Sequence, residues 1–356
     1  MRPLFFMGNY LKKWIEHARP RSLMQSMMPA VLATICAIGS EKFNILCGFA
    51  AILGVVCAHL ALNLADDWFD YRIDMMGDRD KVIRQGFRAM SVKYPYLTDG
   101  SETPRSAAAA IATFGGIALT CGLGIFIYRT VGCGFGGAQG SWIILAITAA
   151  CAFLGMFYSA PPLKLSFRGF GEMVIGFIFG PLLMWGVYYS TAGSIDAGIS
   201  FISIPVGLLV LNILFTHSFI DMEGDAASNK MTFARLLGNR KLCLAASYIF
   251  TFVPFIMIVI AVATGVLHPI YLIVLLVIPR GIWLCHSLHC FSADSSHKNE
   301  IPDQPYRWLG PMAKNWDIVR EKGVDWFLMR WLCARNILSG FCAMMIISKV
   351  ITLIIG

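Results

Sequence analysis

One short run of the sequence, residues 63–80, carries the residue types from which a metal-dependent reaction site is built. At 100° per residue, a helix through this run places five polar side chains within about 60° of one line on its surface: Asn63, Asp66, Asp67, Asp70 and Asp74. Carboxylates this close repel one another, and in a low-dielectric setting they stay ionised only beside positive charge. The pattern therefore predicts Mg²⁺ together with a phosphorylated substrate, because Mg²⁺ prefers carboxylate and phosphate oxygens.

A second acidic cluster repeats this spacing later in the chain. Asp221 and Asp225 are one helical turn apart at the end of an apolar stretch, as Asp70 and Asp74 are. Two carboxylate pairs of this kind suit two Mg²⁺ ions with a diphosphate between them. Nearby cations would take the remaining phosphate charge. The candidates are Arg72, Arg79, Lys164, Lys230 and Arg235.

The composition places these clusters in a membrane protein. Of 356 residues, 57% are hydrophobic and only 14% are charged, whereas soluble domains carry roughly 25% charged residues. We expect a single all-α membrane domain over residues 1–356, with nine helices around a central cavity. Nine apolar segments are long enough for a helix to span the hydrocarbon core of about 30 Å. They lie near residues 22–40, 44–67, 107–128, 142–160, 172–191, 200–219, 241–264, 268–290 and 336–355. The loop 292–335 is expected to carry an interfacial helix.

The positive charge reports membrane topology. All but four of the 29 Lys and Arg residues fall on one side of the predicted spans if the N-terminus is cytoplasmic. This distribution accounts for the net charge of +8 and argues against nucleic-acid binding. We expect an integral protein of a prokaryotic cytoplasmic membrane, with its N-terminus, both acidic clusters and the cavity opening on the cytoplasmic side.

Diphosphate chemistry inside a membrane favours a prenyl diphosphate donor. Metal ions and cations would stabilise the leaving diphosphate and ease ionisation to an allylic carbocation. An apolar cavity would shield that carbocation from water, and aromatic faces would stabilise it. An electron-rich aromatic acceptor would then attack, while the prenyl tail extends between the spans toward membrane lipid.

Both acidic motifs resemble those of the UbiA superfamily of intramembrane prenyltransferases. The first family motif, N-D-x-x-D-x-x-x-D, matches D-D-W-F-D-Y-R-I-D from Asp66 to Asp74, with Asp66 where the family usually has Asn. The second motif is D-x-x-x-D with a following Lys and a T-x-A-x-x-x-G tail. It matches Asp221, Asp225, Lys230, Thr232, Ala234 and Gly238. The resemblance covers roughly residues 20–290.

Within that superfamily the chain is most similar to the dihydroxynaphthoate prenyltransferases of the menaquinone pathway. The run L-N-L-A-D-D-W-F-D resembles that branch's N-L-A-N-D-Y-F-D, and the run from Tyr158 to Glu172 resembles it too. The resemblance implies Mg²⁺-dependent transfer of a polyprenyl group to dihydroxynaphthoate. It also implies that the loop with Tyr158 and Lys164 lies beside the donor diphosphate. Glu172, which opens a predicted span, is expected either to contact the acceptor or to interact with the helix dipole, and His217 is a candidate substrate-binding residue. The chain departs from the branch at Asp74, where Gly is usual, and at His217-Ser218, where an Asn pair is usual.

Three alternatives remain open from the sequence. A member of the same superfamily could use another acceptor, such as para-hydroxybenzoate, a glycerol-phosphate lipid, haem or a chlorophyll precursor. An ion-coupled transporter could use acidic residues as a cation path, although such groups usually lie near the membrane midplane. The literal D-D-x-x-D from Asp66 to Asp70 also leaves room for a terpene-cyclising member of the superfamily.

Overall fold

The computed structural model describes residues 2–75, 94–132, 142–227, 230–293, 316–321 and 323–355. The description of side chains does not extend to residues 2–7, 73–75, 132 and 227. Within these described ranges the protein is helical and forms no strand. One isolated parallel bridge joins Arg168 and Met231. The all-α fold predicted from the apolar segments is confirmed.

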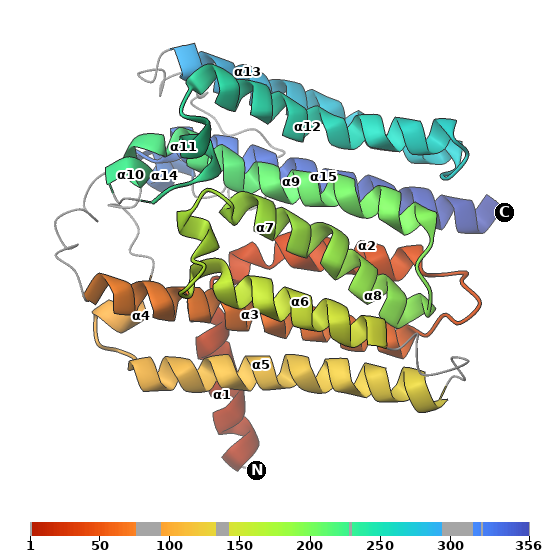
Figure 1. Cartoon of the computed structure of the whole chain (residues 1–356), viewed down its shortest axis with the longest axis horizontal. Helices are drawn as coiled ribbons and strands as arrows, with labels where there is room; N and C mark the ends of the chain where they lie inside the picture. The colour runs from red at the N-terminus through yellow and green to blue at the C-terminus, as the bar shows by residue number, and fades with distance from the viewer. Residues whose placement is uncertain are drawn as a thin grey trace. The chain divides into compact units, whose positions relative to one another are not determined.

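Contacts between the helices divide the chain into two compact units, and Figure 1 labels the helices. The first unit contains α1 (Arg2–His17), α2 (Met24–Cys36), α3 (Ile45–Met75), α4 (Pro95–Thr98), α5 (Pro104–Ile127), α6 (Trp142–Ser159) and α8 (Leu183–Ala192). Helix α3 packs most extensively along α5 and also contacts α2, α6 and α8. The helix that carries the first acidic motif is therefore the central element of this unit.

The C-terminal half of α3 packs into a hydrophobic core that includes residues of the N-terminal segment. Trp14 of α1 is fully buried and packs with Leu60 and Leu64 of α3. Tyr94 and Tyr96, from the segment that contains α4, complete the same cluster. The chain segments before α2 and after α3 are thereby both held against the acidic end of α3.

The opposite end of the first unit is closed by a buried arginine. Arg129 lies in a π-helical turn, η4 (Tyr128–Gly132), and its side chain is fully buried. Its guanidinium donates to the carbonyl oxygens of Ser190 and Thr191 at 2.7–3.0 Å, and to that of Lys42 at 3.0 Å. A guanidinium has five N–H donors, so one side chain satisfies the last carbonyls of α8 and joins three segments.

The second unit is organised around α9. It contains α7 (Gly171–Phe177), α9 (Ala197–Ile220), α10 (Met222–Ala227), α11 (Phe233–Leu237), α12 (Arg240–Ala263), the 3₁₀ helix η7 (Pro269–Val277), α13 (Ile278–Ala293), α14 (Trp316–Glu321) and α15 (Asp325–Ile355). Helix α9 packs against α12, α15 and α7, and α9 and α15 run side by side (Figure 1). Helix α9 ends at the second acidic motif.

Two glycines let α9 approach its neighbour at backbone distance. A Cβ built on Gly180, in the π-helical turn η6 (Ile178–Leu182), would lie 2.4 Å from Gly207 Cα and 2.7 Å from Ser203 O. A Cβ on Gly207 would lie 2.6 Å from Gly176 O. These contacts are backbone against backbone, so larger residues at either position would force the helices apart.

Eight helical segments are long and apolar enough to cross a membrane, counting only the described residues. They are 45–72, 104–131, 142–159, 171–192, 197–220, 240–263, 269–293 and 325–355. The first predicted span, 22–40, is shorter than expected, since α2 has 13 residues and is preceded by a 3₁₀ turn at Pro20–Ser22. At 1.5 Å per residue α2 covers about 20 Å, which is less than the hydrocarbon core. The protein is an integral membrane protein.

The last span also begins earlier than predicted. Helix α15 starts at Asp325 rather than near residue 336, and is 31 residues long. The expected interfacial helix divides in two, because Gly323 adopts a positive φ of 62° between α14 and α15. The remainder of the predicted loop, at 294–315 and 322, lies outside the described residues.

Candidate functional site

Helix α3 carries the first acidic motif without interruption. The helix runs from Ile45 to Met75, so Asn63, Asp66 and Asp70 lie on one face, as their spacing predicts. Asp67 is fully buried, and the side chain of Asp66 is 19% exposed. The backbone of Asp74 belongs to the same helix, while its side chain and the whole of Arg79 lie outside the described residues.

A cation from the N-terminal segment lies against these carboxylates. Arg19 Nη2 lies 3.1 Å from Asp67 Oδ1 and 3.4 Å from Asp66 Oδ2. Tyr96 donates its hydroxyl to Asp67 Oδ2 at 3.2 Å. Burial, followed by the negative charge of Asp67, raises the pKa of the Tyr96 phenol above its usual range, so the hydroxyl stays protonated and acts as a donor. Both oxygens of Asp67 are therefore engaged within the first unit.

The neighbouring polar groups hold the same region together. Ser159, the last residue of α6, donates to Asp66 Oδ1. Asn63 donates its amide to Ala18 O and to Ser22 Oγ, both at 2.9 Å. The amide of Asn63 thus binds the turn that presents Arg19, and this contact gives Asn63 a supporting position beside the motif.

The cations predicted to contact phosphate in this unit occupy different settings. Arg72 is exposed, and its guanidinium carbon lies 4.7 Å from the ring centre of Trp68. Lys164 follows α6 and adopts a positive φ of 44°. Its backbone N–H donates to Ala160 O at 3.0 Å, which closes the turn after α6. Tyr158 lies within α6 and is partly buried.

The second acidic motif sits at a helix break in the second unit. Asp221 is the C-cap residue that directly follows α9, Asp225 lies in α10, and the Asp225 N–H donates to Asp221 O at 2.8 Å. Both side chains are buried, with exposed fractions of 6% and 1%. A Cβ on Gly224 would lie 2.4 Å from Asp221 Oδ1. The glycine within D-M-E-G-D therefore makes room for the Asp221 carboxylate above α10.

The segment after α10 folds back onto Asp225. The Lys230 N–H donates to Asp225 O at 2.9 Å. Arg235 Nη1 donates to Asp225 O at 3.3 Å and to Lys230 O at 2.6 Å. These bonds keep the Lys230 backbone and the Arg235 guanidinium next to the second carboxylate pair.

The T-x-A-x-x-x-G tail of the second motif is a local structural unit. Thr232 is the N-cap residue of α11, Ala234 is fully buried, and Gly238 ends the helix with a positive φ of 63°. Glycine is favoured at this position because a side chain strains the left-handed backbone. The tail builds the short helix that returns the chain toward the second acidic motif.

Glu172 supports that helix from α7. Its side chain is buried, and its Oε1 accepts a hydrogen bond from Ser218 Oγ at 2.6 Å. Both carboxylate oxygens lie 3.2 Å from the Phe233 N–H. Since Phe233 is the first residue of α11, Glu172 caps α11 from a distance and joins it to α7 and α9. Its contacts are with protein groups that shape the second motif.

His217 lies one turn before Asp221 on α9. Its ring packs edge-on against Phe327 of α15, with the ring centroids 4.9 Å apart. Its carbonyl accepts the Asp221 N–H at 3.0 Å. The position adjoins the second motif.

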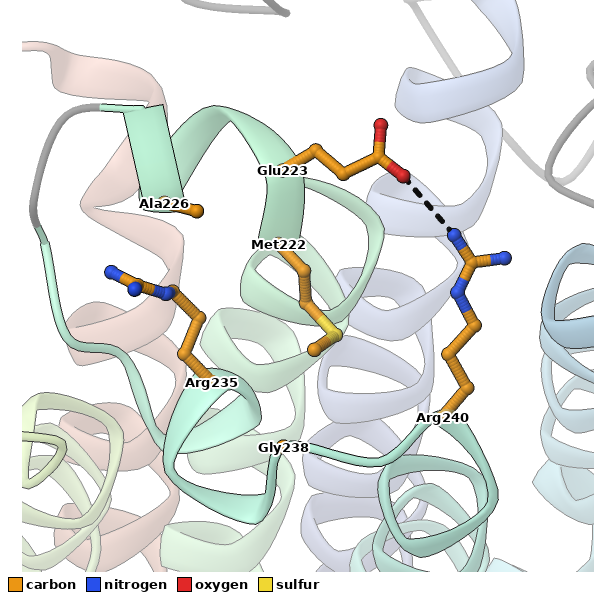
Figure 2. A pocket seen from close by; sticks show the side chains of 6 residues that line it. All are labelled: Met222, Glu223, Ala226, Arg235, Gly238 and Arg240. Atoms are coloured by element: carbon orange, nitrogen blue, oxygen red, sulfur yellow. Dashed lines mark hydrogen bonds and ion pairs between the residues drawn. The ribbon is translucent and has the colours of Figure 1, made fainter.

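A small pocket opens beside α10 (Figure 2). Its lining residues are Met222, Glu223, Ala226, Arg235, Gly238 and Arg240. Figure 2 shows Arg235 on one side and Arg240 on the other, with Arg240 Nη2 paired to Glu223 Oε1 at 3.2 Å. The pocket adds a second arginine close to the D-x-x-x-D turn.

The donor set of each unit suits Mg²⁺ in type. Among the side chains that the structure describes, no group of three or more His, Cys, Asp or Glu residues could alone hold a metal ion. Mg²⁺ is usually held by one or two carboxylates, with substrate phosphates and water completing the octahedron. Asp70 on α3 and the Asp221–Asp225 pair provide oxygen donors of that kind.

Sequence comparison decides the family. The sequence model of the UbiA prenyltransferase family matches residues 26–300, which is most of the chain. This chain belongs to the UbiA prenyltransferase family. It is therefore a membrane-bound prenyltransferase, and the transporter alternative is set aside.

Relatives within the UbiA family share most of the chain's length. The 1,4-dihydroxy-2-naphthoate octaprenyltransferase of Bacillus subtilis (strain 168) is 26% identical over 271 residues, covering 74% of this chain and 78% of that enzyme. The Haemophilus influenzae enzyme of the same name is 26% identical over 287 residues, covering 77% of this chain and 85% of that one.

Solved UbiA structures have the same fold. A digeranylgeranylglyceryl phosphate synthase superposes with a TM-score of 0.57 at 15% identity, covering 95% of this chain and 99% of that chain. A UbiA homologue from Archaeoglobus fulgidus, bound to GPP and Mg²⁺, superposes with a TM-score of 0.53 at 15% identity, covering 91% and 99%. At this identity the likeness shows the fold.

Three residues of the UbiA site region were missed by the sequence analysis: Arg19, Tyr96 and Ser159. Arg19 counted only toward topology, although it directly precedes Pro20 in a polar turn next to an apolar segment. A charge at that position, so near the first apolar segment, was a signal that it has an acidic partner. Tyr96 and Ser159 are ordinary in sequence, and only their contacts with the α3 carboxylates reveal them.

Proposed function

We propose that this UbiA-family protein transfers a polyprenyl group from a prenyl diphosphate to 1,4-dihydroxy-2-naphthoate, in a Mg²⁺-dependent reaction of menaquinone biosynthesis. The observation that carries the reaction class is the buried Asp221–Asp225 pair, held in one turn beside Lys230 and Arg235. The acceptor is supported by relatives that carry this activity in their names and match about three quarters of the chain.

The carboxylates of α3 and of the α9–α10 turn are proposed to bind the metal. Asp70 and Asp74 serve in the first unit, and Asp221 and Asp225 serve in the second. Mg²⁺ bound by these groups supplies positive charge to the diphosphate and makes it a better leaving group. The UbiA homologue solved with GPP and Mg²⁺ supports this choice of metal and donor.

The remaining polar residues are proposed to orient the two substrates. Arg72, Lys164 and Lys230 donate charge-assisted hydrogen bonds to phosphate oxygens, which fixes the donor and stabilises the departing charge. Tyr158 lies on the same helix as Ser159, close to the first motif. His217 adjoins the second motif and is proposed to contact the acceptor.

The setting of the reaction follows from the charge distribution. We propose that the N-terminus and both acidic motifs lie on the cytoplasmic side of a prokaryotic membrane, because nearly all Lys and Arg residues fall on that side of the spans. The prenyl tail of the donor then extends into the apolar interior or the surrounding lipid.

Substitution of the metal-binding carboxylates tests the proposal. Asp70→Ala and Asp221→Ala are each expected to lower transfer by about a thousandfold or more, since each removes charge that stabilises the transition state. Both variants should remain folded in detergent, as judged by thermal unfolding. The exposed Glu41 provides the control, and Glu41→Ala should transfer at the wild-type rate. Sustained turnover in both aspartate variants would overturn the assignment.

A further inference from the structure

Arg19 lies in a turn and has a strained, left-handed backbone conformation. Arg19 has φ 57° and ψ 62°, in the left-handed region that non-glycine residues rarely adopt. Such a conformation persists only where surrounding contacts determine it. Here Asn63 Nδ2 binds Ala18 O at 2.9 Å, and Ser22 Oγ donates to Arg19 O at 2.9 Å. These hydrogen bonds hold Arg19 in a strained backbone conformation, and that conformation positions its guanidinium against α3.

That guanidinium meets three acceptors on α3. Arg19 Nη2 lies 3.1 Å from Asp67 Oδ1, 3.4 Å from Asp66 Oδ2 and 3.2 Å from Asn63 O. One cation therefore bridges two adjacent carboxylates and a backbone carbonyl. Charge-assisted contacts of this kind are among the stronger hydrogen bonds in proteins.

Tyr96 completes the coordination of Asp67. Its hydroxyl donates a hydrogen bond to Asp67 Oδ2 at 3.2 Å, while Arg19 forms an ion pair with Asp67 Oδ1. Asp67 is fully buried among these partners. One Asp67 oxygen accepts a hydrogen bond from Tyr96, and the other is ion-paired with Arg19 inside the core, so protein groups engage this carboxylate on both sides.

Asp66 adds a second negative charge directly next to Asp67. Asp66 Oδ2 is ion-paired with Arg19, and Asp66 Oδ1 accepts a hydrogen bond from the Ser159 hydroxyl. Two adjacent carboxylates in a partly buried site are strongly unfavourable unless a cation accompanies them.

We propose that Arg19 is a positioning residue that takes the place of a metal at the Asp66–Asp67 pair. It neutralises these two carboxylates, so that Mg²⁺ and the donor diphosphate are confined to the next turn of α3, at Asp70 and Asp74. This inference rests on the proposed function. It assigns Asp67 to the support of the site and makes Arg19 and Asp66 a coupled charge pair.

The coupling predicts a rescue. Arg19→Gln removes the cation and leaves two neighbouring carboxylates that compete for Mg²⁺. Asp66→Asn removes one of those charges. Adding Asp66→Asn to Arg19→Gln therefore returns the local charge to its original value, although the Arg19 hydrogen bonds remain lost.

The experiment measures binding of a prenyl thiolodiphosphate, which resists cleavage, to the full-length protein in detergent as Mg²⁺ is varied. Arg19→Gln is expected to weaken this binding by about tenfold or more, and to raise the KM for the cleavable donor more than it lowers kcat. Asp66→Asn alone, and the double variant, should bind within about threefold of wild type. Arg21→Gln removes an exposed arginine of the same turn and should bind like wild type.

A second substitution keeps the test decisive if Arg19→Gln folds poorly. Tyr96→Phe removes one hydroxyl and leaves Arg19 in place, so it frees Asp67 Oδ2. It should raise the Mg²⁺ concentration needed for half-maximal donor binding by about threefold. A purely structural role would change the unfolding temperature of these variants without changing their Mg²⁺ requirement.

The outcomes separate this inference from the proposed function. If Arg19→Gln and Tyr96→Phe both bind the donor with the wild-type Mg²⁺ requirement, or if the double variant is as weak as Arg19→Gln, the inference is overturned. If wild type binds the donor but gives no naphthoate product, only the acceptor is wrong and the Arg19 measurements remain valid. Wild type that binds no prenyl thiolodiphosphate with Mg²⁺ would contradict both.

Discussion

Glu172 illustrates how one carboxylate can shape a site through protein contacts. It accepts from Ser218 on α9 and from the first N–H of α11, and it is buried where it does so. Three segments therefore depend on a single side chain, and one of them carries Lys230 and the T-x-A-x-x-x-G tail. The sequence places Glu172 at the start of a span, but it contains no sign of the Phe233 contact, which joins residues 61 positions apart.

This role gives a stability prediction for Glu172. Glu172→Ala leaves the Ser218 hydroxyl and the Phe233 N–H without their acceptor in a buried setting, which should cost about 1–3 kcal/mol. Thermal unfolding in detergent would measure the loss. Glu223→Ala is a matched control in the same unit, because the Glu223 side chain is 88% exposed and its ion pair should contribute about 0–1 kcal/mol. Equal stability of the two variants would contradict the capping role.

At the scale of elements, helix continuity accounts for what was predictable about the acidic motifs. Spacing of three and four residues placed Asn63, Asp66 and Asp70 on one face, and α3 is continuous through them. The second motif has the same spacing, yet the helix breaks at Asp221, and Gly224 makes room for the carboxylate there. Periodicity cannot reveal such a break, because its cause is the packing of a side chain over the next turn.

The close backbone contact between Gly180 and α9 can also be tested by substitution. Gly180→Ala directs a methyl group into the backbone of α9 at Gly207, which should destabilise the protein by about 1–3 kcal/mol through overpacking. Gly116→Ala, on α5, is the control, since a Cβ there meets nothing within 4 Å and alanine favours helix by about 1 kcal/mol.

Unfolding temperatures in detergent would separate these two glycine variants. We expect Gly180→Ala to unfold at a lower temperature than wild type and Gly116→Ala to unfold at or above the wild-type temperature. The reverse order would show that the close approach of η6 to α9 does not depend on the missing side chain at Gly180.

At the scale of the whole molecule, hydropathy predicted the all-α membrane fold because apolar length is a property of each segment alone. It placed the last span too late and the first span too long, since Gly323 and the short α2 are set by local backbone geometry. Arg129 shows the same limit, because it directly follows an apolar segment in the sequence and yet is buried against the end of α8. Contacts between distant segments, such as the ion pair between Arg19 and α3, cannot be predicted from the hydropathy of each segment taken alone.

We expect this UbiA-family enzyme to prenylate dihydroxynaphthoate in a Mg²⁺-dependent reaction. The most direct test supplies the purified protein with a long prenyl diphosphate and either dihydroxynaphthoate or para-hydroxybenzoate, with and without EDTA. We expect prenylated naphthoate that disappears with EDTA, and little product from para-hydroxybenzoate. Product from para-hydroxybenzoate alone would contradict the acceptor, and transfer that persists in EDTA would contradict the role given to the acidic motifs.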